Sequence, residues 1–482
     1  MKIAVIGGGI GGLAVAYNIM QIAIDNRLER PEVVVFEAHD RLGGNADTMY
    51  FTFGEGPQNT QLRRWADLGV NDFNKSAYTE IDRVMQTIGF EQGQDYRPLE
   101  NTTSYFTGNG SVCFTENRKH PWGTGIDARL KESVDDFMQT AGDDVAKHKY
   151  KRYTLEEYIV ERSKERGWDD RLGPQVVYPR VNGMYFISSA LGPRKMPFRS
   201  VMHYYSIQEG AGKNSTDRMY FVGGTRHWID SLARYMTVHL GVQFQTGINA
   251  TVTKDTTGWK VCDPDNGQNV FRADVVVWAA HANQALRAIR TPPAGVSPVL
   301  AKIKYETALS VAHTDSRLLP TNRNAWCTYN ILIHEPGAAA MKPYTITYLG
   351  NRHQNDAENP EYDKFGLPEF FVSINPHRPV PEPMVLKDDD GHPAMTYLHH
   401  NVFDFDCIHA QCEIEELQGR EGLYFAGGWT RGSGLHEECW HQGQNVARKI
   451  MGTDTGTRDA LDPHDLLHER LTATLDGGSS RA

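Results

Sequence analysis

Residues 2–20 read KIAVIGGGIGGLAVAYNIM, and this stretch decides the fold. A short apolar run before the glycines predicts a buried β-strand, and the apolar residues after them predict a helix. Three glycines fit a G-x-G-x-x-G pattern. Gly7 allows a tight turn, Gly9 allows the backbone to approach a pyrophosphate, and Gly12 lets the helix pack closely on the sheet. The stretch therefore predicts a dinucleotide-binding βαβ unit within an α/β fold.

The second strand of that unit is predicted at residues 33–36, and it ends at Glu37. A carboxylate at this place can accept hydrogen bonds from ribose hydroxyls. Glu37 lies 25 residues after Gly12 (37 − 12), beyond the usual ~20, which indicates a longer helix or loop between them. The helix start offers N–H groups and a positive dipole end to phosphates. Because strand, turn, helix and acid occur in order, dinucleotide binding is favoured over a glycine turn without a ligand.

Bulk properties indicate a soluble enzyme of the cytoplasm. A chain of 482 residues exceeds what one core usually supports, so two domains are expected. The net charge of −10 gives no sign of a nucleic-acid partner. No apolar run approaches the ~20 residues of a transmembrane segment, and the N-terminal apolar run leads directly into the glycine turn, which is typical of a strand and not of a signal peptide.

Cysteine and histidine patterns predict no metal centre. The six cysteines are scattered and form no C-x-x-C pair, so neither a disulfide framework nor a zinc site is expected. The nineteen histidines include no H-E-x-x-H spacing.

The run after the acid indicates which dinucleotide is bound. Residues 37–44 read EAHDRLGG and resemble the E-A-x-x-R-x-G-G signature of the flavin amine oxidase superfamily. The resemblance implies FAD as the cofactor. Arg41 would then offer charge near the phosphates, and Gly43 and Gly44 would leave room for the backbone beside them.

A closer resemblance covers most of the chain. Residues 67–78, DLGVNDFNKSAY, resemble the D-x-G-F-x-x-F-N-x-x-x-Y segment of a bacterial subfamily usually described as predicted NAD/FAD-binding proteins. Residues 432–438, GSGLHEE, resemble its G-Y-G-F-H-E-D. Further similar segments are AHANQAL at 280–286, HTD at 313–315 with AW at 325–326, and SINP at 373–376.

The resemblance implies a Rossmann-like FAD-binding domain with an inserted α+β substrate domain, as in amine oxidases and p-hydroxybenzoate hydroxylase. We expect the FAD-binding domain at residues 1–75, 219–300 and 405–455. The substrate domain is expected at 76–218 and 301–404, and a loose tail at 456–482. Beyond the glycine turn, expected elements are a helix at 78–88, a β-meander over 243–261, a buried parallel strand at 273–280, strands at 344–349, 370–374 and 423–428, and helices at 228–238 and 437–451.

The cofactor contacts follow from the glycine motif and from the resemblance. Gly69 to Asn71 would lie along the isoalloxazine, and Leu435 with His436 would start the last helix beside the flavin pyrimidine. The predicted cofactor-binding residues are Gly7, Gly9, Ile10, Gly11, Gly12, Glu37, Ala38, Arg41, Gly43, Gly44, Asn45, Gly69, Val70, Asn71, Ile248, Ala280, Gly427, Gly428, Leu435 and His436.

His436 is the candidate catalytic residue. An imidazole at the start of the last helix could donate to flavin O2 or shuttle a proton, and the alternative is a packed histidine without a chemical step. Glu437 suits the helix dipole at least as well as a catalytic role. His281 is expected to brace loops, and covalent flavin attachment through His400 is a minor alternative.

One departure from the superfamily bears on the reaction. Amine oxidases commonly place a lysine near flavin N5 after a Y-x-x-x-x-K pattern, but here Tyr305 is followed at that spacing by Ser310. Lys302 and Lys304 precede the tyrosine. The subfamily's N-H-G-L-L pocket wall is also absent, although Pro179 and Pro197 are kept. We therefore expect a changed substrate.

The predicted function is a two-electron dehydrogenation of a small organic substrate, an amine or a specialised-metabolite intermediate. An acyl-chain desaturase or isomerase of the same fold is one alternative, and a non-catalytic flavin-binding protein is another. No second G-x-G-x-x-G follows, and residues 210–214 lack P-loop spacing, so no NAD(P)H-binding domain is expected. Oxygen, a quinone or a protein carrier would reoxidise the flavin.

Overall fold

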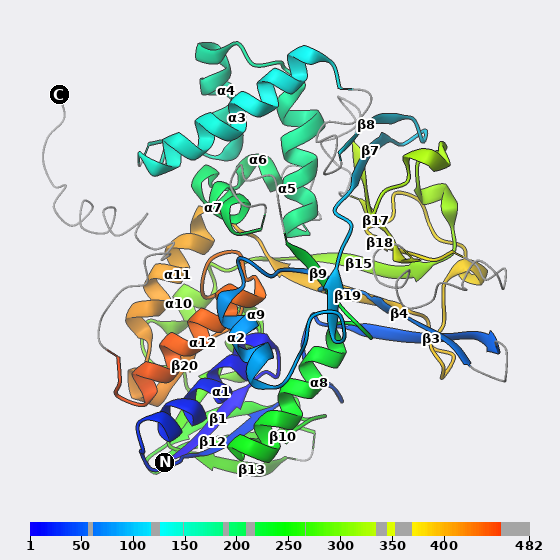
Figure 1. The fold of residues 1–482 in the computed structure, drawn as a ribbon. Coiled ribbons are helices and arrows are strands. Elements are labelled where there is room, and N and C mark those ends of the chain that lie inside the picture. Colours follow the sequence, from blue (N-terminus) through cyan, green and yellow to red (C-terminus); the bar gives the residue numbers. More distant parts are fainter. Residues whose placement is uncertain are drawn as a thin grey trace, which may run out of the picture.

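The computed structural model describes residues 1–55, 61–116, 126–147, 149–186, 192–208, 217–265, 267–333, 345–351 and 369–454. The predictions for the tail at 456–482, for residues 210–214 and for Tyr344 fall outside these ranges. Figure 1 shows three regions: a parallel sheet with its helices at the bottom, a larger sheet above it to the right, and a group of helices at the top.

The parallel sheet has five strands, and all four of its pairings are parallel. Its central strands are almost wholly apolar and buried, as expected for a parallel sheet covered on both faces. The order across the sheet is β10 (Gln243–Gln245), β2 (Glu32–Phe36), β1 (Lys2–Ile6), β14 (Val275–Trp278) and β20 (Leu423–Phe425). Each of the three segments predicted for the FAD-binding domain contributes strands, whereas the domain bounds themselves stay a prediction.

Two helices pack together beside the parallel sheet: α1 (Ile10–Asp25) and α12 (His436–Ile450). Their backbones approach closely at Gly443, where a Cβ atom would lie 2.5 Å from the Cβ atom of Ala14. Tyr17 and Trp440 add a ring contact of 5.3 Å between centroids. The last helix is therefore held against the helix that follows the glycine turn.

The predicted meander is partly wrong. The antiparallel meander consists of β11 (Thr251–Asp255), β12 (Gly258–Asp263) and β13 (Gln268–Ala273). Residues 243–245 instead form β10, which pairs in parallel with β2. These residues follow a helical segment, which consists of α8 (Thr225–Tyr235) and Met236–Leu240. A helical connection of this kind typically precedes a strand that pairs in parallel.

The larger sheet has seven strands, and only the β16–β7 pairing in it is parallel. Its order is β19 (Met395–Asn401), β15 (Tyr305–His313), β18 (Phe371–Ile374), β17 (Ile346–Leu349), β16 (Tyr329–Ile333), β7 (Thr103–Thr107) and β8 (Val112–Glu116). Two smaller sheets are β3 (Thr48–Glu55) with β4 (Gln61–Asp67), and β5 (Phe73–Asn74), β9 (Arg218–Phe221) and β6 (Tyr96–Pro98).

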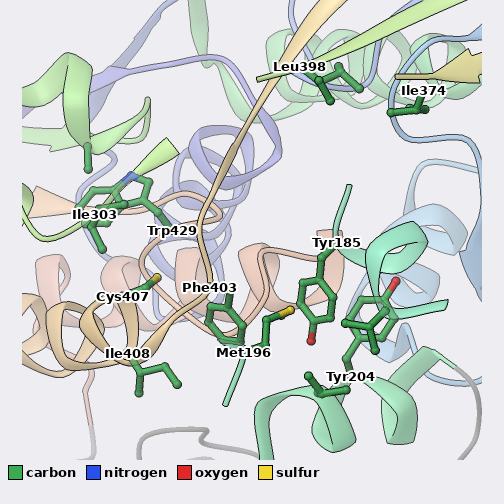
Figure 2. Packing of buried hydrophobic residues seen from close by; sticks show 14 of the residues in the cluster. Tyr185, Met196, Tyr204, Ile303, Ile374, Leu398, Phe403, Cys407, Ile408 and Trp429 are labelled. Atoms are coloured by element: carbon green, nitrogen blue, oxygen red, sulfur yellow. The ribbon is translucent and has the colours of Figure 1, made fainter. Parts of the chain in front are cut away.

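A group of helices lies at the top of the molecule in Figure 1. It comprises α3 (Ala128–Ala146), α4 (Leu155–Arg166), α5 (Tyr178–Tyr185), α6 (Gly192–Lys195) and α7 (Phe198–Gln208). Figure 2 shows Tyr185 of α5 between Tyr204 of α7 and Phe403, so one apolar core joins these helices to the sheets.

The remaining α-helices are α2 (Thr79–Thr87), α9 (Ala282–Ala288), α10 (Val296–Leu300) and α11 (Phe405–Leu417). Among the described helices, none combines the length and the apolar character needed to cross a bilayer.

Candidate functional site

One cavity of about 910 Å³ collects residues from both sheets. Ile6, Phe36 and Trp278, the last residues of three parallel strands, lie in its wall. The opposite wall comes from the larger sheet and from α5 and α7. Ligands bind α/β folds at the carboxyl ends of parallel strands, and small-molecule pockets fill ~300–1,000 Å³. Position and volume therefore both suit an extended ligand.

The glycines of the first turn have two different roles. A Cβ atom on Gly7 would lie 2.7 Å from the amide nitrogen of Ala280, and one on Gly12 would lie 2.0 Å from the carbonyl oxygen of Gly7. These positions need glycine for close packing, which confirms the role predicted for Gly12. A Cβ atom on Gly9 would meet only Gly44, at 4.0 Å, so Gly9 borders open space in the cavity wall.

Glu37 holds the glycine turn through its carboxylate. Its Oε2 accepts a hydrogen bond from the Gly8 N–H at 2.7 Å, and its Oε1 accepts one from the His39 N–H at 2.9 Å. The side chain is buried and lies in the cavity wall. Each carboxylate oxygen has a second lone pair, so Glu37 can still accept from a ligand hydroxyl.

Arg41, which was predicted to offer charge near the phosphates, makes two contacts within its own loop. Its Nη1 donates to the carbonyl oxygen of Gly44 at 3.0 Å, and its Nη2 lies 2.9 Å from a carboxylate oxygen of Asp47. Arg41 lines the cavity, and its contacts fix the loop that carries Gly43 and Gly44. A phosphate role for Arg41 stays a prediction.

The first turn of α12 borders the same cavity at His436. The His436 side chain is half-buried, and its imidazole has no hydrogen-bond partner within the described ranges. Desolvation of the ring lowers its pKa to about 4. The ring is therefore neutral at pH 7, with one N–H donor and one nitrogen acceptor. Such a group can polarise or hydrogen-bond a ligand without carrying charge. Its catalytic role stays a prediction.

Glu437 does not line the cavity. Its carboxylate accepts hydrogen bonds from the backbone N–H groups of Glu80 and Ile81, at 2.8 and 3.1 Å. These are orphan donors of the first turn of α2, so Glu437 caps a helix that lies 357 residues earlier in the chain. Helix-end electrostatics thus accounts for this acid at two helices: it lies in the first turn of α12, as expected, and it also caps α2.

All of the predicted cofactor-binding residues except Gly12 and Gly69 line the cavity. Gly69 has a packing role, since a Cβ atom there would lie 2.0 Å from the carbonyl oxygen of Asn45. The cavity thus brings together residues from segments that lie far apart in the sequence.

The other histidines singled out in the sequence also border the cavity. The His281 ring stacks on Tyr305, with centroids 4.8 Å apart, and the His400 ring stacks on Phe186 at 5.2 Å. Burial lowers the pKa of each imidazole to about 4.

Ser310 occupies the position where a lysine is expected. It pairs in register with Thr396, a residue of the cavity wall, so it lies on the same face of the sheet. The side chain is fully buried and outside the wall, and its Oγ has no hydrogen-bond partner among the described residues. A serine here is too short to reach the cavity as a lysine would.

Sequence reasoning missed the tyrosine-rich end of the cavity. Asp72 accepts a hydrogen bond from Arg218 at 2.5 Å through Oδ1 and one from the Tyr329 hydroxyl at 2.7 Å through Oδ2. The abundance of aromatic residues between 100 and 215 was the only signal. The tyrosines of this end are Tyr78, Tyr105, Tyr185, Tyr204, Tyr329 and Tyr348.

A buried histidine and serine on the other face of the larger sheet do not form a nucleophilic pair. His313 Nε2 lies 2.8 Å from Ser373 Oγ, but His313 Nδ1 accepts the N–H of Asp315 at 3.0 Å. The ring proton is therefore on Nε2 and points at the serine, so the imidazole cannot take the serine proton. Both residues have no exposed surface, and the pair is structural.

One group of described residues has metal-ligand spacing: Asp388, Asp390 and His392, with ligand atoms within 4.8 Å of one another. Asp388 Oδ1 accepts the backbone N–H groups of the other two, at 3.0 and 2.8 Å. These hydrogen bonds within residues 388–392 account for the close spacing of the three side chains, which do not line the cavity.

Comparisons with known proteins identify the first segment and the fold. Residues 5–88 match the NAD(P)-binding Rossmann-like domain family. The match confirms the βαβ unit predicted from the glycine motif. No curated protein matches the chain in sequence.

Solved structures match along nearly the whole chain. A CLA-producing fatty acid isomerase from P. acnes superposes with a TM-score of 0.60 at 14% identity, covering 93% of this chain and 98% of that one. Wild-type putrescine oxidase bound to putrescine gives 0.59 at 12%, covering 94% and 99%. Reduced UDP-galactopyranose mutase gives 0.57 at 14%, covering 98% and 97%.

These similarities confirm the predicted fold class. The chain has a Rossmann-like domain and the fold of the flavin amine oxidases and their structural relatives. The structural neighbours are enzymes. At sequence identities of 12–14%, the similarity shows a shared fold alone.

Proposed function

We propose that this chain binds FAD in the cavity and catalyses a two-electron dehydrogenation of a small organic substrate. The observation that carries the proposal is that the glycine turn after β1, Glu37 at the end of β2 and the first turn of α12 all border one cavity. Residues of the larger sheet line another part of the cavity, and we place the substrate there.

The described residues fit a dinucleotide. Gly9 and Gly44 border the cavity with little in front of them, so a pyrophosphate can approach the backbone there. The α1 helix begins at Ile10 and directs its unpaired N–H groups toward the same place. Glu37 and the segment around Ile248 would hold the adenosine part, and Gly427 and Gly428 would pass the ribityl chain.

Bound FAD would supply the two-electron acceptor, and the chain's own groups would set the geometry around it. The tyrosines and the larger sheet would hold the substrate and exclude water. The first turn of α12 would stabilise negative charge at its N-terminus. His436 would hold a proton on one ring nitrogen and donate it as a hydrogen bond.

Several classes of substrate are compatible with this proposal. An amine and a specialised-metabolite intermediate both fit a dehydrogenation, but the buried Ser310 removes the lysine expected of an amine oxidase. An acyl-chain isomerase or desaturase is the second candidate, because a fatty acid isomerase shares the fold over nearly its whole length. The polar tyrosine end of the cavity weighs against a long apolar chain. A protein that binds flavin without turnover is the remaining alternative.

The test begins with the visible spectrum of the purified protein. We expect a flavin spectrum and close to one FAD per chain, and anaerobic mixing with panels of amines, acyl thioesters and carrier-bound intermediates should bleach the flavin with one class only. Oxygen, a quinone and carrier proteins can then be compared as acceptors. A colourless protein that takes up no FAD would refute the proposal.

Glu37→Ala gives the residue-level test of the site. Loss of both hydrogen bonds to the glycine turn and of the acceptor for the ligand should weaken FAD affinity by at least ~10-fold, the order of one lost charge-assisted hydrogen bond. The matched control is Glu32→Ala, at the other end of β2, where the glutamate pairs with Lys2 at the surface. Equal FAD affinities of the two variants would remove Glu37 from the site.

A further inference from the structure

Two arginines of the cavity wall, Arg287 and Arg290, have exposed side chains with no hydrogen-bond or ion-pair partner among the described residues. Arg287 lies in the last turn of α9, and Arg290 follows that helix. Arg41 of the same wall is different, because Gly44 and Asp47 hold its guanidinium. A guanidinium that borders a cavity with all of its donors available can bind a ligand there.

Backbone hydrogen bonds place Arg290 beyond the end of β2. The Ile248 N–H donates to the carbonyl oxygen of Glu37 at 2.9 Å, so residues 248–251 start beside that end. They lead into β11, where the carbonyl oxygen of Val252 accepts the Arg290 N–H at 2.8 Å. All residues from 248 to 251 line the cavity. The wall therefore runs from Glu37 through this segment to the arginines.

This order of wall segments matches the order of groups in adenosine diphosphate. The glycine turn would hold the pyrophosphate, and Glu37, whose carboxylate accepts the Gly8 N–H, would accept the ribose hydroxyls. The next group along such a ligand is the base. It would reach residues 248–251 and then the two arginines.

Adenine and a guanidinium group are complementary. The base is planar, with electron-rich faces and ring nitrogens that accept hydrogen bonds at its edge. A guanidinium is also planar, stacks on aromatic faces and has five N–H donors. The wall contains three acids, and none of them pairs with Arg287 or Arg290. Binding of the base would therefore break no ion pair in the described part of the chain.

We infer that Arg287 and Arg290 hold the adenine base and make the site selective for FAD over FMN, which ends at its phosphate and has no adenine. The inference rests on the proposed function, since it assigns part of the same cavity to the adenosine of FAD. It adds two residues that lie outside the glycine motif, in the segment after β14.

The test compares FAD, ADP and FMN as ligands of the full chain. Affinities are measured by calorimetry after any flavin that co-purifies has been removed. Replacing both arginines (Arg287→Ala with Arg290→Ala) should weaken the binding of FAD and of ADP by about tenfold, the order of two cation–π contacts at an exposed site. FMN affinity should change by less than about twofold. Both side chains are exposed, so the fold should tolerate their removal.

Arg234→Ala is the matched control, because Arg234 is an exposed arginine of α8 that does not line the cavity. The series is repeated in about 1 M salt, where charges act over only ~3 Å. An equal loss of FMN affinity, or a loss that disappears in high salt, would reduce the effect to long-range attraction and overturn the inference.

The remaining outcomes separate the inference from the proposed function. Equal FAD affinities of the double variant and Arg234→Ala would refute the inference alone. ADP binding that depends on both arginines, in a chain that takes up no FAD, would keep the adenine site and refute the proposed function. Binding of none of the three ligands would refute both.

Discussion

His436 is a neutral imidazole at the start of a helix, and this combination predicts a measurable effect on a bound flavin. Its pKa of about 4 means that it donates a hydrogen bond at pH 7 without contributing charge. Donation to reduced flavin, which is anionic, stabilises the reduced form. His436→Ala should keep FAD bound but lower its two-electron midpoint potential by ~30–60 mV, equivalent to about 1.5–3 kcal/mol.

The conservative variant separates this role from packing. His436→Gln keeps a side-chain donor and should recover most of the potential, while flavin reduction by a substrate should slow by ~10²-fold in His436→Ala. A potential and a reduction rate equal to the wild type in His436→Ala would assign the residue to packing.

Residues whose partners lie nearby in sequence were predictable, and residues with distant partners were not. The glycine turn and Glu37 fall within one βαβ unit, and the spacing of that unit predicts their place in the cavity wall. Asp72 stands next to a predicted contact, Asn71, but its partners Arg218 and Tyr329 are 146 and 257 residues away. No local pattern reports such a pairing.

At the scale of elements, the contact between α12 and α2 predicts a stability effect that leaves the cavity intact. Glu437 accepts two backbone N–H groups at the start of α2, and its carboxylate is buried. Loss of a helix cap and of charge-assisted hydrogen bonds costs about 2 kcal/mol. Glu437→Ala should lower the free energy of unfolding by that amount in urea denaturation.

The FAD affinity of Glu437→Ala serves as the control measurement. Because Glu437 does not line the cavity, this affinity should change less than threefold. Glu416→Ala, which removes an exposed glutamate of α11, should leave stability at the wild-type value. An equal stability of both variants would show that α2 does not depend on this cap.

Strand type was predictable from composition, but strand pairing was not. The apolar residues of β14 predicted a buried parallel strand and those of β20 predicted a buried strand, and both pair in parallel. The alternation around residues 243–261 predicted one continuous meander, yet β10 joins the parallel sheet beside β2. Alternation reports which face of a strand is buried, whereas the helical crossover before β10 decides its neighbour.

Across the whole molecule, histidines that are neutral at pH 7 connect the cavity to the stability of the fold. His281, His400 and His436 border the cavity, and His313 lies on the other face of the larger sheet. Burial lowers the pKa of each of these four imidazoles from the usual 6.5 to about 4. The same burial that shapes the ligand site therefore makes the fold sensitive to acid.

The sign of this sensitivity follows from proton uptake. Between pH 6.5 and pH 4 the unfolded chain binds protons at these histidines and the folded chain does not, so stability falls as the pH falls through this window. Each histidine costs on the order of 1–2 kcal/mol at pH 5. Carboxylates affect stability at lower pH. Arg171 lowers the pKa of Asp169 to about 2, so the contribution of Asp169 to stability is lost only below about pH 4.

Thermal unfolding between pH 4 and pH 8 measures the effect, and we expect the midpoint to fall steadily below pH 6.5. His313→Gln removes one titrating group without touching the cavity wall, so its midpoint should fall less steeply than that of the wild type between pH 6.5 and pH 4.5. His239→Gln, which changes an exposed histidine, should keep the wild-type profile. Parallel pH profiles for His313→Gln and the wild type would mean that this imidazole is protonated in the folded chain, against the burial and the hydrogen bonds that surround it.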